Sequence, residues 1–319
     1  MVNTLYLAKR IVVSIISVIA IASIVFGMTA AIPGSAATIV LGTQRTEEAM
    51  HQLEQQMGLT RPLYERYIDF VLHTFTFDWG TSLISGQPVS KLVVPAFFRT
   101  LELALVATII SIIIAIPLGV LTAAKRDSIF DTVSLNLSYV AISIPSFVSA
   151  TLLLLFLTTP PLNLFPNGGY VPLSENPIGW LYHLILPAIS INFVIFAYVL
   201  RQTRSSMIET LEADFIRTAR LKGVAESNVL ARHALRNGLL PTITVLAINF
   251  GWMMGSVVII EEIFSYPGIG RVIVRAISSR DLPVIQAAIL VPTMAFILAN
   301  LVADLLYTVL DPRIELGEK

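Results

Sequence analysis

The stretch LALVATIISIIIAIPLGVLTAA, residues 103–124, decides the fold class of this chain. It contains no charged residue, and Lys125 and Arg126 follow it directly. The hydrocarbon core of a bilayer is about 30 Å thick, and roughly 20 apolar helical residues cross it. A crossing segment must be helical because lipid offers no hydrogen-bonding partners to its backbone. The stretch therefore predicts a transmembrane helix.

The composition extends this prediction to the whole chain. Of the 319 residues, 55% are hydrophobic and 13% are charged, whereas soluble domains carry about 25% charged residues. The mean hydropathy is +0.78. We expect an all-α integral membrane protein that lies in the lipid bilayer.

The same composition argues against several classes of function. The formal net charge is zero, so no bulk field attracts nucleic acid and we expect no nucleic-acid partner. The chain has no cysteine, its four histidines are scattered, and it has no Gly-x-x-x-x-Gly-Lys-Ser/Thr loop. Thiolate chemistry and this type of nucleotide site are therefore excluded. We expect no catalytic residue, no metal and no cofactor in this chain.

Six apolar runs predict six spans. They cover residues 11–32, 103–124, a segment within 132–159, 181–200, 239–260 and about 284–310. The Pro160-Pro161 pair should end the third helix and leave 162–177 as a loop. A signal peptide is the alternative for the first run, but its apolar core exceeds the usual length of about 7–15 residues.

Lysine and arginine are distributed unevenly among the expected loops. With six spans, both termini lie on one side, together with most of the 21 Lys and Arg residues. Positive charge is retained on the cytoplasmic side of membranes. We expect a multi-pass protein of the plasma (inner) membrane with both termini in the cytoplasm.

The spans divide the chain into four parts. These are a tail with the first span (1–32), an extracytoplasmic segment (33–98), a transmembrane core (99–310) that includes a cytoplasmic loop at 201–238, and a C-terminal tail (311–319). In the extracytoplasmic segment, Thr46 should cap a helix that Gly58 ends, and residues 61–77 should form another helix. The segment is either a structural plug or an element with a ligand role.

No ionisable residue falls in the middle of a span, so nothing marks a proton or sodium site. If the protein moves a substance uphill, a partner should supply the energy. The candidates for a pathway or gate are Ser143, Pro145, Asn249, Glu261 and Glu262. Plainer interpretations stay open, because polar residues also join helices, proline kinks are common and interfacial charges cost little.

A basic stretch, ADFIRTARLKGVAESNVLARHALRNGLLP at 213–241, separates two of the most hydrophobic segments. An Arg at the centre of a span costs about 2.5–3.5 kcal/mol, so its five basic residues keep this stretch out of the bilayer. Residues 209–222 are rich in helix formers, and Gly223 is a natural terminator. A second helix is expected at 226–237, with Gly238 at its end.

Within the first of these helices, Leu211, Phe215 and Ala219 follow one another at a spacing of four, which predicts one apolar row. Arg217 and Arg220 fall on a neighbouring face, and Asp214 should support Arg217 as an i, i+3 pair. An exposed apolar row flanked by charges fits a groove on a partner protein.

These residues also carry a family resemblance. RTARLKG (217–223) and RHALRNGLLP (232–241) are similar to the cytoplasmic loop of binding-protein-dependent ABC transporter permeases. The general signature of these permeases begins with Glu-Ala-Ala, where this chain has Arg217-Thr218-Ala219. This divergent form resembles the B-type permease subunit of the dipeptide/oligopeptide/nickel group. SIPSF (143–147), EEIFSYPGIGRVIVRAISSRDLPVIQA (261–287) and DLLYTVLDPRI (304–314) extend the resemblance over nearly the whole chain.

The resemblance implies a permease subunit of an ATP-driven importer, with peptides as the expected substrate. It implies a homologous second permease subunit, two cytoplasmic ATP-binding subunits and an extracytoplasmic solute-binding protein as partners. ATP hydrolysis would take place in those subunits and not in this chain. The expected coupling residues are Leu211, Asp214, Phe215, Arg217, Thr218, Ala219, Arg220 and Gly223, with Phe215 as the central apolar contact.

Two other classes of protein share most of these sequence features. A secondary transporter or channel with an incidental basic loop would transport without ATP. A membrane-anchored receptor that recruits a signalling partner would transport nothing.

Overall fold

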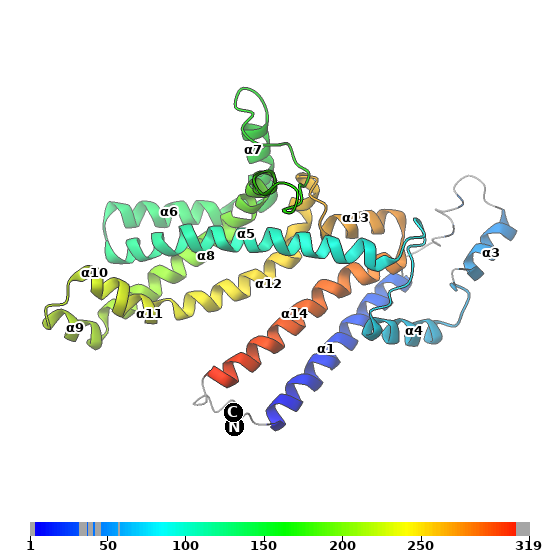
Figure 1. Cartoon of the computed structure of the whole chain (residues 1–319), viewed down its shortest axis with the longest axis horizontal. Helices are drawn as coiled ribbons and strands as arrows, with labels where there is room; N and C mark the ends of the chain where they lie inside the picture. The colour runs from blue at the N-terminus through cyan, green and yellow to red at the C-terminus, as the bar shows by residue number, and fades with distance from the viewer. Residues whose placement is uncertain (1–3, 32–36, 38–40, 42–45, 57, 311–319) are drawn as a thin grey trace. The chain divides into compact units, whose positions relative to one another are not determined.

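The computed structural model describes residues 4–31, 37, 41, 46–56 and 58–310. In this part of the chain the regular structure is helical, and one isolated antiparallel bridge joins Thr81 to Pro88. The helices, labelled as in Figure 1, are α1 (Thr4–Ala31), α3 (Glu47–Gln56), α4 (Leu63–Thr76), α5 (Val89–Ala124), α6 (Ile129–Ser143), α7 (Ser146–Thr158), α8 (Pro177–Glu212), α9 (Asp214–Leu221), α10 (Glu226–Asn228), the π-helical η1 (Val229–Ala234), α11 (Leu235–Gly238), α12 (Leu240–Ile263), α13 (Ile269–Ser279) and α14 (Leu282–Leu310).

Among the described residues, four helices are long and apolar enough to cross a bilayer, namely α1, α5, α8 and α14. The number rises to six if each of two bent helix pairs counts as one span. The prediction of an all-α integral membrane protein is confirmed.

The third predicted span is broken. Helices α6 and α7 meet at an angle of 99°, and Pro145 stands at the start of α7. Proline has no amide hydrogen and disfavours the helical conformation in the residue before it. Ile144 accordingly adopts extended angles, φ −88° and ψ 117°.

Helices α5 and α8 each have 36 residues, far more than the roughly 20 that a bilayer needs. The predicted limit of the fourth span at residue 200 is therefore not the end of its helix. Helix α8 runs on to Glu212 without interruption and leads directly to the basic stretch.

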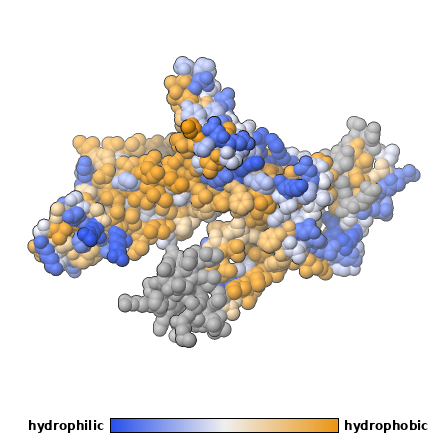
Figure 2. Space-filling view, viewed as in Figure 1, coloured by the Kyte–Doolittle hydropathy of each residue, from blue (hydrophilic) through white to orange (hydrophobic). Residues whose placement is uncertain are grey.

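The chain divides into two compact units, residues 99–267 and the remainder. In the first unit, residues of α5, α7, α8 and α12 form the main apolar core. Gly119 of α5 permits close packing there, because a Cβ at this position would lie 2.7 Å from Thr203 Cβ and 2.8 Å from the Leu200 carbonyl oxygen. Hydrophobic residues cover α5, α6 and α8, whereas hydrophilic residues gather around α9 to α11 (Figure 2).

In the other unit, α1 packs against α14 and α4. Tyr67 of α4 shares a 2.8 Å hydrogen bond with Ser23 of α1, and Gln286 of α14 donates to Thr29. The helices predicted for the outer segment are present. Thr46 accepts a hydrogen bond from the Ala49 amide, as an N-cap does, and Gly58 has a positive φ of 66° after α3.

Candidate functional site

The basic stretch begins where α8 ends. Ala213 has extended angles (φ −68°, ψ 147°), and α9 starts at Asp214. Gly223 follows α9 with φ +77°, a left-handed conformation that suits glycine. The predicted glycine stop is confirmed, but the helix predicted over 209–222 is divided at Ala213, and Leu211 belongs to α8.

A small core seats α9 on the end of α8. Its buried members are Ala123, Met207, Ile216, Ala219, Val229 and Ala234, and Leu211 is among the partly buried residues around them. The predicted exposed row of Leu211, Phe215 and Ala219 is therefore wrong. The break at Ala213 changes the register, so that Ile216 and Ala219 face the core and only Phe215 of the predicted row is exposed.

The outward face of α9 combines apolar and charged groups. Phe215 is 46% exposed and Leu221 is 81% exposed. Asp214, Arg217 and Thr218 are also exposed. Sequence reasoning missed Leu221, although an apolar residue in the last turn before a glycine stop was a visible signal. Helix α9 therefore has one face buried against the small core and one face exposed.

Arg220 is exposed, but its guanidinium already has a partner within the basic stretch. Its guanidinium contacts Glu226 at 2.6 Å, and this hydrogen bond is the main cause that holds the pKa of the Glu226 carboxyl below its usual value. The ion pair closes the turn between α9 and α10. The expected support of Arg217 by Asp214 is not formed, since among the described residues Arg217 has no ion-pair partner within 4.0 Å.

The second predicted helix is helical throughout but irregular. A π-helical turn, Val229–Ala234, lies between α10 and α11. Gly238 is the last residue of α11, yet the chain continues in helical conformation through Leu239 into α12. Gly238 allows close packing against α8, because a Cβ at this position would lie 2.5 Å from Met207 Sδ.

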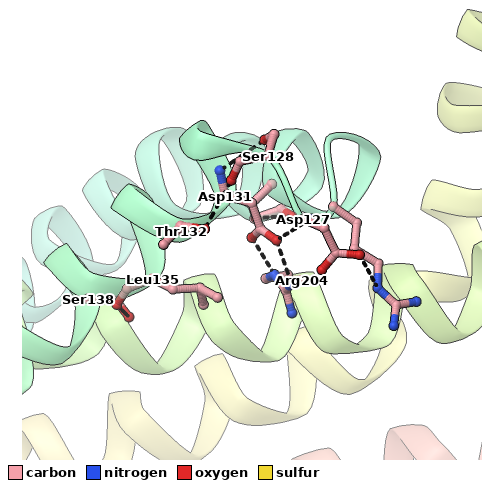
Figure 3. Close-up of polar contacts among 10 residues, drawn as sticks. Asp127, Ser128, Asp131, Thr132, Leu135, Ser138 and Arg204 are labelled. Carbon is pink, nitrogen blue, oxygen red and sulfur yellow. Dashed lines mark hydrogen bonds and ion pairs between the residues drawn. The ribbon is translucent and has the colours of Figure 1, made fainter.

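An ion pair that sequence reasoning missed anchors α8 just before α9 (Figure 3). Arg204 of α8 donates to both carboxylate oxygens of Asp131 at 2.6 Å each. The Asp131 side chain is only 3% exposed, and its other contact is the Asp127 amide at 3.0 Å. Ser128 caps α6 by accepting from the Asp131 amide. No sequence spacing could pair residues from two helices so far apart in the chain.

A second contact joins the same elements at the surface. Arg126, in the turn before α6, reaches Glu212 at the end of α8 at 2.5 Å. Together with the Asp131–Arg204 pair, it ties the start of α6 to the last turns of α8. The end of α8 that carries α9 is thus fixed at two points.

The predicted pathway residues lie on different elements. Ser143 and Pro145 are exposed at the break between α6 and α7, and Asn249 lies within α12 and donates to the Val245 carbonyl. Glu261 is fully buried and accepts from Thr100 Oγ1 at 2.5 Å, whereas Glu262 is exposed. The two adjacent glutamates therefore have different surroundings.

Polar residues of the main core join helices. Asn192 of α8 accepts from Ser111 of α5 at 2.9 Å and donates to the Ala107 carbonyl. Ser149 of α7 donates to the Ser190 carbonyl of α8 at 3.2 Å. Ser149 and Asn192 therefore join neighbouring helices.

Glu102, directly before the apolar run 103–124, contacts one residue of the loop 159–176 and one of α8. It accepts hydrogen bonds from Tyr170 and from Trp180, both at 3.1 Å. Burial, followed by the charge of Glu102, raises the pKa of the Tyr170 hydroxyl. Tyr266 packs edge-on against Tyr170 and donates to the Arg99 carbonyl at 2.9 Å. This end of the unit is closed by its own hydrogen bonds.

Apolar helices of this length, together with a basic stretch that exposes apolar and charged side chains, define a multi-pass membrane protein. Comparisons with known proteins identify the family to which the chain belongs. Residues 115–316 match the family described as binding-protein-dependent transport system inner membrane component, and residues 3–104 match the N-terminal part of such components. The chain belongs to this family and is a permease subunit of an ABC importer.

Curated relatives align along nearly the whole chain. A protein named as a peptide transport system permease of Brucella abortus is 39% identical over 312 residues, which cover 98% of this chain and 99% of the relative. A protein named as a glutathione transport system permease of Salmonella typhi is 33% identical over 309 residues, which cover 97% and 98%. This agrees with the B-type group that the sequence motifs indicated.

Proposed function

We propose that this chain is one half of the membrane path of a peptide importer, powered by ATP hydrolysis in separate subunits. The names of the relatives support the substrate class. The excess of Lys and Arg on one side supports a plasma (inner) membrane location with both termini in the cytoplasm. The path is completed by a homologous second permease subunit, and an extracytoplasmic solute-binding protein delivers the peptide.

The observation that carries the coupling role is the seating of α9. Its inner face is buried in the small core with Ile216 and Ala219, and its outer face exposes Phe215 and Leu221. In this proposal the outer face docks into a groove of a cytoplasmic ATP-binding subunit. Asp214, Arg217 and Thr218 make the polar contacts around Phe215, whereas Arg220 and Gly223 hold the turn behind the helix.

The ion pairs give this docking element a mechanical connection. A force on α9 acts on α8 through the small core, and Asp131 with Arg204 passes it to α6. Helix α6 ends at the break before Pro145. In this proposal, closure of the ATP-binding subunits moves α8 and α6 together and bends the chain at this break, which changes access to the path.

The replacement Phe215→Asp tests the docking role. It should reduce co-purification of the ATP-binding subunits at least tenfold, because a charge replaces the apolar contact at the centre of the groove. Expression and membrane insertion should stay normal, since Phe215 is not part of the small core. The measurement is the ratio of ATP-binding subunit to this chain after mild-detergent purification.

Ile129→Asp is the matched control. Ile129 is 84% exposed at the start of α6 and lies outside α9, so this variant should retain its ATP-binding subunits. Normal recovery of those subunits with Phe215→Asp, or equal loss with both variants, would contradict the role given to Phe215.

A further inference from the structure

Two neighbouring cavities in the unit that contains α1, α4 and α14 differ sharply in character. One, of about 310 Å³ and called the polar cavity below, has a mixed lining in which charged and polar groups of α4 and the segment after it, including Arg66, Asp69 and the Trp79 indole, stand beside apolar side chains. The other, of about 460 Å³, is lined almost wholly by apolar side chains of α1, α5 and α14 and by Phe75 and Phe77. Trp79 lines both cavities.

The polar cavity contains two donors without acceptors. Arg66 is half-buried and has no ion pair or side-chain hydrogen bond among the described residues, and burial lowers the pKa of its guanidinium. The indole N–H of Trp79 is buried and likewise has no hydrogen-bond partner. A buried donor such as the Trp79 indole N–H is unfavourable when it has no acceptor. Arg61, which lines the same cavity, is already paired with Asp69 at 2.6 Å. The donors that lack an acceptor are therefore those of Arg66 and Trp79.

The cavities lie at different depths along the same helices. On α1, Phe26 lines the polar cavity and Val18 lines the apolar one; they are about two turns, or roughly 12 Å, apart. On α14, Ala287 lines the polar cavity and Leu298 the apolar one, roughly 16 Å further along. One leaflet of a bilayer core is about 15 Å deep. The polar cavity thus lies near one end of the spans, and the apolar one extends from about their middle toward the other end.

The outer surface of α4 also fits a lipid environment. Tyr64, Ile68, Leu72 and Phe75 recur at helical spacing and are 65%, 52%, 60% and 42% exposed. Such a stripe is unfavourable in water but favourable where an amphipathic helix lies in the headgroup region. Ser23 and Tyr67 hold α4 against the membrane helix α1.

We propose that these cavities form one binding site for a phospholipid. Its phosphate accepts hydrogen bonds from Arg66 and the Trp79 indole, and an acyl chain lies in the apolar cavity between α1, α14 and the start of α5. Trp79 stands at the junction of headgroup and chain, a position typical of tryptophan in membrane proteins. The lipid would hold α4 and the following segment against the spans.

The first test is phospholipid retention by the full chain purified in mild detergent, measured by native mass spectrometry. Arg66→Gln should bind phospholipid about tenfold more weakly, as loss of a charge-assisted hydrogen bond implies, and Trp79→Phe, which keeps most of the ring, should bind about threefold more weakly. Lys91→Gln removes the same charge from an exposed residue of α5 that lines neither cavity, and it should retain lipid normally. Equal retention by Arg66→Gln and Lys91→Gln overturns the proposal.

The second test separates a phospholipid from its parts. Delipidated wild-type protein is titrated with a short-chain phosphatidylethanolamine, with a diacylglycerol of the same chains and with inorganic phosphate, and its melting temperature is followed. Only the phospholipid should raise the melting temperature, and Ala295→Trp, which fills the apolar cavity, should abolish the rise. An equal rise with inorganic phosphate or with diacylglycerol alone overturns the proposal. So does a loss of solute-binding-protein affinity in Arg66→Gln with lipid retention unchanged, because the surface would then serve that partner.

Discussion

Two ion pairs of equal length lie in different surroundings within the unit of residues 99–267. Asp131–Arg204 and Arg220–Glu226 both have a 2.6 Å contact. The side chains of the first pair are 3% and 20% exposed, and those of the second are 58% (Glu226) and 43% (Arg220) exposed. An ion pair in water contributes little, whereas an unpartnered charge left behind in a buried site is costly. The contact distance alone therefore does not show which pair contributes more to stability.

The comparison also shows what orders the basic stretch. The exposed pair closes a turn, but α9 is seated by buried apolar residues, Ile216 and Val229 among them. The buried pair, Asp131–Arg204, holds α8, the helix that precedes α9 in the chain. We infer that stability comes from the small core and from the anchor at Asp131, and that surface charge makes only a minor contribution.

The largest effect is expected from breaking the buried pair. Asp131→Ala leaves the Arg204 guanidinium without its carboxylate, and the free energy of unfolding should fall by about 3 kcal/mol. Transport should fall further than the recovery of ATP-binding subunits, because α9 can still dock while its connection to α6 is lost. Thermal unfolding in detergent, co-purification and uptake assays on one preparation measure the three quantities.

The double replacement Asp131→Leu with Arg204→Met is the control for that interpretation. Apolar residues of similar volume remove both charges, so stability should recover to within about 1 kcal/mol of the wild type. A double variant as unstable as Asp131→Ala would mean that packing around α6, rather than the uncompensated charge, is responsible.

A smaller loss is expected when the same end of α8 is displaced sterically. Gly119→Val in α5 places side-chain atoms where Thr203 and the Leu200 carbonyl already lie. Overpacking of this kind costs about 1–3 kcal/mol, and it should weaken the neighbouring Arg204 anchor as well. Ala substitution at Gly255 of α12, where a Cβ would meet nothing within 4 Å, is the control and should not lower the melting temperature, because Ala favours a helix more than Gly does. A variant of Gly119 that melts like the wild type would contradict the tight α5–α8 packing.

Much of this architecture could be predicted from the sequence. Uncharged runs identified the membrane helices because the cost of charge in lipid is local and visible in one segment. The Gly223 stop and the Thr46 cap were also readable, since each depends on residues within one turn. Three features could not be read in this way. The Asp131–Arg204 pair joins distant helices, the break at Ala213 reflects the burial of Ile216, and the unpaired Arg66 depends on which carboxylates the fold gives to Arg61.

The smallest effect is expected at the exposed pair. Glu226→Gln removes the charge that Arg220 contacts, and the free energy of unfolding should fall by only about 0.5 kcal/mol. The pKa of Glu226 is held below its ordinary value, chiefly by its hydrogen bond with Arg220. The contribution of the pair is therefore complete above the ordinary carboxyl pKa and is lost as the pH falls through the lowered value. Amide protection at the α9–α10 turn, taken as the ratio of the intrinsic to the observed exchange rate at each pH, should decrease with acidification in the wild type and depend less on pH in Glu226→Gln. A loss of stability as large as that of Asp131→Ala would mean that the turn, and not the buried anchor, determines where α9 sits.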